Sequence, residues 1–161
     1  GKVDSVTGFS FSSYLNLVRL GVPEEDISTI LMADHGLKLY GNAVIVNTDY
    51  AKNNSDMVKK FLVAIGAGWR DAIKDPKAAA AALVKRNPAA DAALEQRRLQ
   101  LAIDANVLTD YVKANGMGGV DSSRFAAAIE QLSETYEYKA APNAALYFTD
   151  EYLPASGISL N

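Results

Sequence analysis

Three short apolar segments near the N-terminal end constrain the fold of this chain most. The alternating run Val3–Val6, the run Ile27–Met32 and the continuous apolar run Asn42–Val46 each have the composition of a β-strand. A continuous apolar strand is typical of a sheet that is covered on both faces. Two or three strands cannot form such a sheet alone, so we expect Asn42–Val46 to lie beside strands that precede residue 1.

Helical patterns occupy most of the remaining sequence. From residue 48 onward, apolar residues between Val58 and Ile73 recur at intervals of three and four, which predicts a long helix. Further helices are predicted after Asp75, Asp91 and Asp121, because an aspartate is a preferred residue immediately before a helix. A shorter helix is predicted near residues 14–20. The result is a lopsided α/β protein, with few strands and many helices.

The composition excludes several classes of function. None of the 161 residues is cysteine and His35 is the one histidine, which leaves no cysteine zinc site and no cysteine nucleophile. The formal net charge of -3 provides no field of a single sign that would attract nucleic acid or an anionic membrane. A small molecule or another protein is therefore the expected partner. We assign no catalytic residue, no metal site and no cofactor.

The start of the sequence bears on what precedes it. The first residue is Gly rather than Met, and the Val3–Val6 run resembles the interior of a strand rather than the start of a chain. We therefore expect an N-terminal part, including any signal peptide, upstream of this sequence. No run of about 18 apolar residues predicts a membrane span.

Several motifs resemble one known family. The stretch ADHGLKLYGNAVIV at residues 33–46 is similar to a recurrent segment of the NMT1/THI5-like substrate-binding proteins of ABC transporters, the group that includes sulfonate, taurine and nitrate binding proteins. Each motif alone is explained by the residues that a strand, a turn or a helix cap requires. The order of the motifs along the chain, however, is similar to that in the C-terminal half of proteins of that family. The other motifs that agree lie at residues 3–8, 61–69, 75–88, 115–121 and 148–154.

The resemblance implies a fold and a division into lobes. It indicates an α/β C-terminal fragment of a two-lobed periplasmic-binding-protein type II fold, mostly helical with two to four short strands. Residues 1–40 would be the remnant of the second lobe with a return crossing, the lobe itself ending near Leu31. Residues 41–154 would be the C-terminal part of the first lobe, and residues 155–161 a flexible tail.

The resemblance also implies a function. The chain would be the solute-binding component of an ABC importer, which captures a small sulfonate, nitrate or pyrimidine-type ligand between two lobes by hinge closure. The N-terminal half, with much of one cleft wall, would be absent from this sequence. The partners would be that ligand and the permease subunits. The location would be periplasmic or extracytoplasmic, with membrane contact only through the permease or a lipid anchor outside this sequence.

Four residues at the first strand–helix junction are candidates for ligand contact. Thr7, Gly8, Phe9 and Ser10 follow a predicted strand and precede a predicted helix, the position where open α/β folds bind ligands. Free N–H groups and hydroxyls suit an anionic or polar ligand, and the Phe9 ring suits a flat one. In the alternative interpretation, Ser10 or a following serine caps the helix and Phe9 packs in the core.

A second group lies at the predicted crossing between the lobes. Tyr40 and Asn42 are candidates for ligand contact, and Gly41 can absorb the dihedral change of a hinge. Asp34 and Gly36 are further hinge candidates. The alternative is ordinary turn chemistry, because Asp side chains bind their own backbone and Gly ends such a segment.

The sequence leaves two other functions open. One is an enzyme similar to the thiamin-pyrimidine synthases, although the histidine- and cysteine-rich motif of that branch is not seen in this sequence. The other is a stand-alone helical protein-interaction domain. A fragment that has lost neighbouring strands also exposes sheet edge, so we expect self-association and a possible homodimer.

Overall fold

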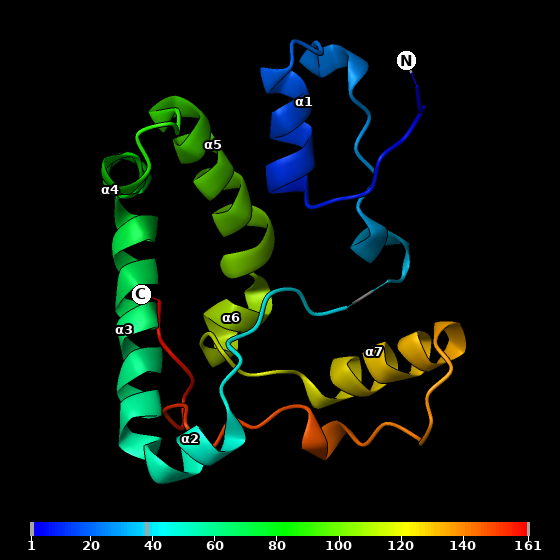
Figure 1. Cartoon of the computed structure of the whole chain (residues 1–161), viewed down its shortest axis with the longest axis vertical. Helices are drawn as coiled ribbons and strands as arrows, with labels where there is room; N and C mark the ends of the chain where they lie inside the picture. Colours follow the sequence, from blue (N-terminus) through cyan, green and yellow to red (C-terminus); the bar gives the residue numbers. More distant parts are fainter. Residues whose placement is uncertain (1, 38, 161) are drawn as a thin grey trace. The chain divides into compact units, whose positions relative to one another are not determined.

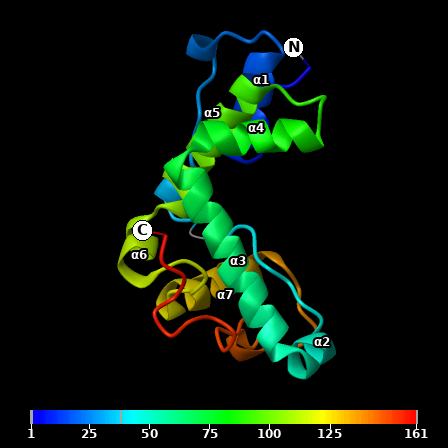
Figure 2. The same ribbon diagram turned by 90° about the vertical axis from the view of Figure 1, so that its left-hand side faces the viewer.

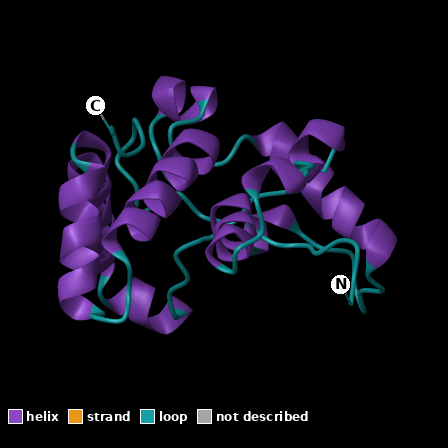
Figure 3. Cartoon of the chain, turned by 90° about the horizontal axis from the view of Figure 1, so that it is seen from above, coloured by secondary structure: helices purple, strands orange, loops and turns teal. Residues whose placement is uncertain are grey.

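The computed structural model describes residues 2–37 and 39–160, and divides the chain into two compact units. Of the described residues, unit 1 comprises 2–30 and 67–114, and unit 2 comprises 31–37, 39–66 and 115–160. Within the described residues the secondary structure is almost entirely helical (Figures 1, 2 and 3). The principal α-helices are α1 (Leu15–Arg19), α2 (Thr48–Asn53), α3 (Ser55–Lys74), α4 (Pro76–Arg86), α5 (Ala92–Ala102), α6 (Asp110–Asn115) and α7 (Ser122–Thr135).

Short turns of 3-10 and π type connect these helices. The π turns are η1 (Ser10–Tyr14), which leads directly into α1, and η4 (Ile103–Val107), which extends α5. The 3-10 turns are η2 (Glu24–Asp26), η3 (Met32–His35) and η5 (Ala144–Leu146). The predicted helix near residues 14–20 is thus confirmed, and Gly21 follows it with a φ of 87°.

Local cap chemistry sets the starts of three helices as predicted. The carboxylate of Asp75 accepts a hydrogen bond from the Ala78 N–H at 2.9 Å, and Asp91 and Asp121 cap α5 and α7 in the same way. Pro76 then occupies the first position of α4, where its missing N–H costs nothing. These caps confirm the predicted helix starts.

In unit 1 the core forms around α5 and the turns that pack on it. Leu15 of α1 is completely buried, and Ile103 at the end of α5 is almost so. Helices α4 and α5 pack against each other, as Figure 1 shows, and η1 also contacts α5. Ala80 of α4 is a small residue and is buried. Unit 1 is therefore a helical cluster with a small apolar centre.

In unit 2 the C-terminal residues contribute to the core. The backbones of Met117 and Ile158 exchange two hydrogen bonds, of 2.8 and 2.9 Å, which form an isolated antiparallel bridge. Ile158 and Leu160 are buried, and the Ile158 side chain lies directly on Gly66 of α3. Ile158 of this C-terminal segment thus packs beside α3. The flexible tail predicted at residues 155–161 stays a prediction.

The predicted strands are not present in the described residues. Val3–Val6, Ile27–Met32 and Asn42–Val46 carry no strand, and the Met117–Ile158 bridge is the β pairing found there. Strands are stable only when their N–H and C=O groups pair with a neighbour. The segments have the composition of strands but no such neighbour. The helical part of the predicted fold class is confirmed, and the strand part is not.

Candidate ligand-binding site

The segment that holds Gly36 and Tyr40 packs on helix α7 in unit 2. The Tyr40 hydroxyl accepts a hydrogen bond of 2.8 Å from the backbone N–H of Asp121, at the start of α7. The Arg124 guanidinium lies 4.6 Å from the centroid of the Tyr40 ring and donates a hydrogen bond of 3.0 Å to the Leu39 carbonyl. A cation over an aromatic face is attracted by the ring quadrupole. Tyr40 is therefore fixed at both its ring and its hydroxyl.

Aromatic contacts extend this cluster toward the C-terminal segment. The rings of Tyr40 and Phe125 meet edge to face with centroids 6.1 Å apart, and Phe125 makes a similar contact of 6.1 Å with Phe148. Such pairs stabilise by about 0.5–1.5 kcal/mol beyond the area that they bury. The three rings join residues 40, 125 and 148 in one apolar cluster beside the polar start of α7.

Asp121 organises the N-terminus of α7. Hydrogen bonds from the Ser123 hydroxyl and then from the Arg124 N–H hold the pKa of its carboxyl below the usual value. The carboxylate therefore stays ionised, which suits the positive end of the helix dipole. Because the same residue donates its backbone N–H to Tyr40, the cap and the aromatic cluster are directly coupled.

A pocket lies beside Gly36 and the exposed face of α7. Gly36 has a φ of 96° and its carbonyl accepts a hydrogen bond of 2.9 Å from the Gln131 amide. This glycine ends η3 in the left-handed region, as a turn requires. The pocket has a volume of about 510 Å³, and the residues that line it are Ala33, Gly36, Ser123, Arg124, Ala127 and Gln131.

The other predicted residues of this group have less defined surroundings. Asp34, Gly41 and Asn42 are exposed. Asp34 lies in η3, where turn chemistry accounts for its position. The structure thus brings Gly36 and Tyr40 onto α7, while the roles of all five residues as hinge or ligand contacts stay predictions.

The first predicted group lies in unit 1, at the start of η1. Thr7, Gly8 and Phe9 are exposed, and the Phe9 carbonyl accepts hydrogen bonds from the N–H groups of Ser12 and Ser13. Phe9 is the residue before η1 and makes no side-chain cap, so a serine cap, the alternative interpretation, is not found at this helix start. Ser10 is the first residue of the turn itself.

Two features fix the shape of this loop. The rings of Phe9 and Phe11 stack with centroids 5.1 Å apart, and Phe9 keeps 52% of its surface exposed. A side chain at Gly8 would collide with the Ser13 hydroxyl. The loop therefore presents a half-exposed aromatic face, and the role of Phe9 in ligand contact stays a prediction.

Two arginines of α5 anchor this region through contacts that the sequence pattern does not predict. Arg98 donates a hydrogen bond of 2.9 Å to the Phe11 carbonyl, and Arg97 binds both carboxylate oxygens of Glu24. The hydrogen bonds from Arg97 and then from Tyr14 lower the pKa of Glu24 to about 2. The hydrogen bond to Glu24 in turn raises the pKa of Tyr14. Residues 10–24 are therefore anchored to α5.

The sequence signal for these anchors is weak. Adjacent arginines on a helix are typical of a solvated face, and the partners that anchor residues 10–24, Glu24 and Phe11, lie more than 70 positions away from them in the sequence. Spacing within the helix cannot reveal partners at such separations. The Tyr40–Asp121 hydrogen bond was beyond sequence reasoning for the same reason.

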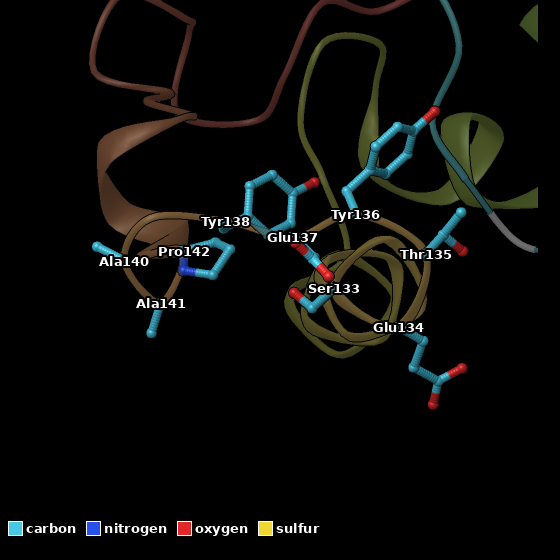
Figure 4. A pocket seen from close by; sticks show the side chains of 9 residues that line it. All are labelled: Ser133, Glu134, Thr135, Tyr136, Glu137, Tyr138, Ala140, Ala141 and Pro142. Atoms are coloured by element: carbon cyan, nitrogen blue, oxygen red, sulfur yellow. The ribbon is translucent and has the colours of Figure 1, made fainter.

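A further pocket follows α7 and is shown in Figure 4. It has a volume of about 730 Å³ and lies among the residues of a turn, where Tyr136 and Tyr138 have ring centroids 6.3 Å apart. Both rings are exposed, at 59% and 48%. In Figure 4 the Glu134 side chain points away from Pro142. The pocket is an open surface hollow rather than an enclosed site.

Across residues 2–37 and 39–160, no cluster of three or more acidic, His or Cys side chains could hold a metal ion. No helix in the same part of the chain is both long enough and apolar enough to cross a bilayer.

Comparison with known families identifies the N-terminal part of the chain. The family model described as NMT1/THI5 like matches residues 1–79. Over these residues the chain is similar to the NMT1/THI5-like family. This confirms the family that the sequence motifs indicated. No curated protein and no solved structure matches the chain significantly.

The NMT1/THI5-like segment contains all of the predicted ligand-binding and hinge residues. It ends within α4, so the α7 residues that contact Tyr40 and Gly36 lie outside it. The two predicted groups also lie in different compact units. Their convergence on a single cleft stays a prediction of the family resemblance.

Proposed function

We propose that this chain is part of the solute-binding component of an ABC importer. The NMT1/THI5-like match over residues 1–79 is the observation that carries the proposal, because that family consists mostly of substrate-binding proteins. In this proposal the chain captures a small ligand of the sulfonate, nitrate or pyrimidine type and delivers it to a permease. It acts by binding and not as an enzyme, in a periplasmic or other extracytoplasmic location.

In this function, hinge closure couples ligand binding to recognition by the permease. A ligand that contacts both lobes favours the closed state by its differential affinity, and a permease can then distinguish closed from open protein. Thr7, Gly8, Phe9 and Ser10 would contact the ligand from one side, and Tyr40 and Asn42 from the other. Asp34, Gly36 and Gly41 would absorb the change in backbone dihedrals.

The exposed apolar segments support the view that this chain is the C-terminal part of such a protein. Val3 and Val6 are 67% and 60% exposed, although both belong to a segment with the pattern of a strand. Large exposed apolar surfaces normally mark an interaction. In the proposed fold these segments would complete a sheet with strands of the remaining half.

Calorimetry tests this function directly. Taurine, nitrate and an aminopyrimidine would each be titrated into this 161-residue chain and into a longer protein that contains it. We expect the longer protein to bind one of the three with a Kd near 1 μM or tighter, about -8 kcal/mol, and this chain to bind far more weakly. The absence of heat from all three in the longer protein would contradict the proposal.

A pair of variants in the longer protein locates the contacts. Ser10→Ala and Tyr40→Ala should weaken binding of the ligand found above, by about 1–3 kcal/mol where a hydrogen bond is lost. Ser28→Ala, at an exposed loop position, is the matched control and should bind normally. Equal affinity of all the variants would remove the proposed residues from the site without removing the function.

A further inference from the structure

The turn that follows the predicted ligand-contact residues of unit 1 has an unusual geometry. η1 is a π turn, a form that is rare in proteins and frequent at functional sites. The residue before it, Phe9, provides no side-chain cap and is largely exposed. Helix capping therefore does not set the position of the loop at residues 7–10.

The guanidinium of Arg98 in α5 holds this turn from outside. Its Nη1 donates a hydrogen bond of 2.9 Å to the Phe11 carbonyl, and its Nη2 donates one of 3.4 Å to the side-chain oxygen of Asn16. The third nitrogen, Nε, donates to Glu95 of the same helix at 3.2 Å. The side chains of Arg98 and Glu95 keep only 23% and 19% of their surfaces exposed, so salt screens this ion pair less than a fully exposed one. One planar group thus joins η1 and α1 to α5.

Contacts within the loop connect this guanidinium to the predicted ligand-contact residues. The Phe11 ring stacks on the Phe9 ring, with an angle of 14° between their planes. The Phe9 carbonyl accepts the N–H groups of Ser12 and Ser13, at 2.9 and 2.8 Å. Ser10 lies between the two phenylalanines in the sequence. A shift of the Phe11 carbonyl would therefore move both the exposed Phe9 ring and the Ser10 hydroxyl.

We propose that Arg98 is a positioning residue for the ligand-binding loop at residues 7–10. It sets the orientation of Phe9 and Ser10 through the Phe11 carbonyl and does not itself contact the ligand. This inference rests on the proposed function. It adds a residue from outside the family match, because α5 follows the residues that the family model covers.

Their contacts distinguish Arg98 from the adjacent Arg97. Arg97 binds the side chains of Glu24 and Tyr14, whereas Arg98 binds a backbone carbonyl within the turn. A lysine has one nitrogen and cannot hold three groups in a planar fork. Arg98→Lys therefore keeps the positive charge and loses the arrangement, which makes it the variant of choice.

Hydrogen exchange of the 161-residue chain, followed by NMR, tests the positioning without a ligand. We expect Arg98→Lys to speed exchange of the Ser12 and Ser13 amides by about tenfold, because their hydrogen bonds within the loop open more often. Arg86→Lys is the matched control, since Arg86 is exposed at the end of α4. Amides of residues 99–102 in α5 should keep their rates in both variants, which verifies that this helix is retained.

The exchange rates decide this part of the proposal. Faster exchange at residues 12 and 13 alone supports it, and equal rates in the wild type and Arg98→Lys overturn it. Glu95→Gln is a milder variant, which weakens the ion pair that orients the guanidinium. It should accelerate the same two amides by a smaller factor. Faster exchange throughout α5 instead would overturn the proposal, because Arg98 would then support the helix rather than the loop.

Calorimetry of a longer protein that contains this chain tests the effect on binding. Taurine, nitrate and an aminopyrimidine are again the probes. For the probe that the wild type binds, Arg98→Lys should raise the Kd about fivefold or more, and Arg86→Lys should change it by less than about twofold. A wild type that binds none of the three contradicts the proposed function and this inference with it. Equal Kd values for the wild type and Arg98→Lys overturn only the role of Arg98.

A double-mutant cycle shows whether Arg98 acts through the loop. In a Phe9→Ala background, Arg98→Lys should raise the Kd by a clearly smaller factor, because the ring that Arg98 orients is gone. A general loss of stability would instead multiply the Kd by the same factor in both backgrounds. Equal factors would therefore overturn the positioning role, even where Arg98→Lys weakens binding.

Discussion

Two glycines of α3 differ sharply in what an added side chain would meet. At Gly66, a Cβ atom would collide with the Ile158 side chain, whereas at Gly68 nothing lies within 4 Å. Gly66 is also buried and Gly68 is exposed. The close approach of residue 158 to α3 therefore depends on the missing Cβ at one position only.

This contrast predicts opposite effects of the same substitution. Gly66→Ala should destabilise the chain by about 1–3 kcal/mol, because Ile158 must shift. Gly68→Ala should stabilise it by up to about 1 kcal/mol, because alanine is the better helix former. The free energies of unfolding would be measured with urea. In an Ile158→Ala background the penalty at residue 66 should largely disappear, and a penalty that persists would contradict the proposed contact.

Glu24 gives a second prediction at this scale, concerning pH. Its pKa in the folded chain is about 2, against 4.5 when unperturbed, because Arg97 and Tyr14 bind the carboxylate. A lowered folded pKa contributes stability that is present above about pH 4.5 and is lost as the pH falls toward 2. The stability difference between the wild type and Glu24→Gln should therefore shrink over this range.

The measurement is a series of urea titrations between pH 6 and pH 2.5. Glu25→Gln serves as the control, since it changes a neighbouring exposed carboxylate that lies outside the Arg97 contacts. A difference at Glu24 that stays constant with pH would show that the ion pair is not formed in solution. Because both partners are substantially exposed, we expect added salt to reduce the effect.

At the scale of elements, α7 depends on the residue that precedes it. The Asp121 carboxylate caps the helix, and its backbone N–H binds Tyr40. Asp121→Ala should destabilise the chain by about 1 kcal/mol, as loss of a cap usually does. Asp121→Asn keeps an oxygen acceptor and should recover most of that loss. Urea unfolding of both variants would test this, and equal loss in both would mean that the cap contributes little.

The helices were predictable because the chemistry that starts them is local. Asp75, Asp91 and Asp121 each bind an N–H group three positions further on, so the sequence alone contains both partners. The same holds for Gly21 and Gly36, which end short helical segments in the left-handed region. Such signals need no knowledge of the rest of the fold.

The predicted strands are not present in the described residues, and the contacts of the site were not predicted. Both depend on partners that are distant in the sequence. The run Asn42–Val46 is apolar enough for a strand, but a ladder needs a partner that these residues do not find within the described chain. Likewise, Arg98 binds Phe11 from 87 positions away. The sequence pattern around a residue indicates which secondary structure it prefers. It does not identify a contact partner that is distant in the sequence.

At the scale of the whole molecule, the two compact units are each built from separate stretches of sequence. The chain passes from one unit to the other at residues 30–31, 66–67 and 114–115. The units do not coincide with the predicted lobes at 1–40 and 41–154, which stay a prediction for the complete family fold.

Hydrogen exchange can show whether the apolar segment at residues 42–46 belongs to a larger sheet. Backbone amides without hydrogen bonds exchange quickly, whereas those in a sheet exchange slowly. In this chain, at concentrations too low for self-association, the amides of residues 42–46 should therefore exchange fast. In a longer protein that contains the chain, the same amides should be protected, because the proposed fold supplies neighbouring strands there.

The interior of α3 provides the internal reference for this experiment. Amides of residues 62–65 lie within a long helix in the structure, so they should be protected in both proteins. Protection of residues 42–46 that appears only in the longer protein would support the missing-lobe interpretation. Fast exchange in both would mean that this apolar segment is not a strand of the transporter fold, because a sheet cannot leave its central amides open to water.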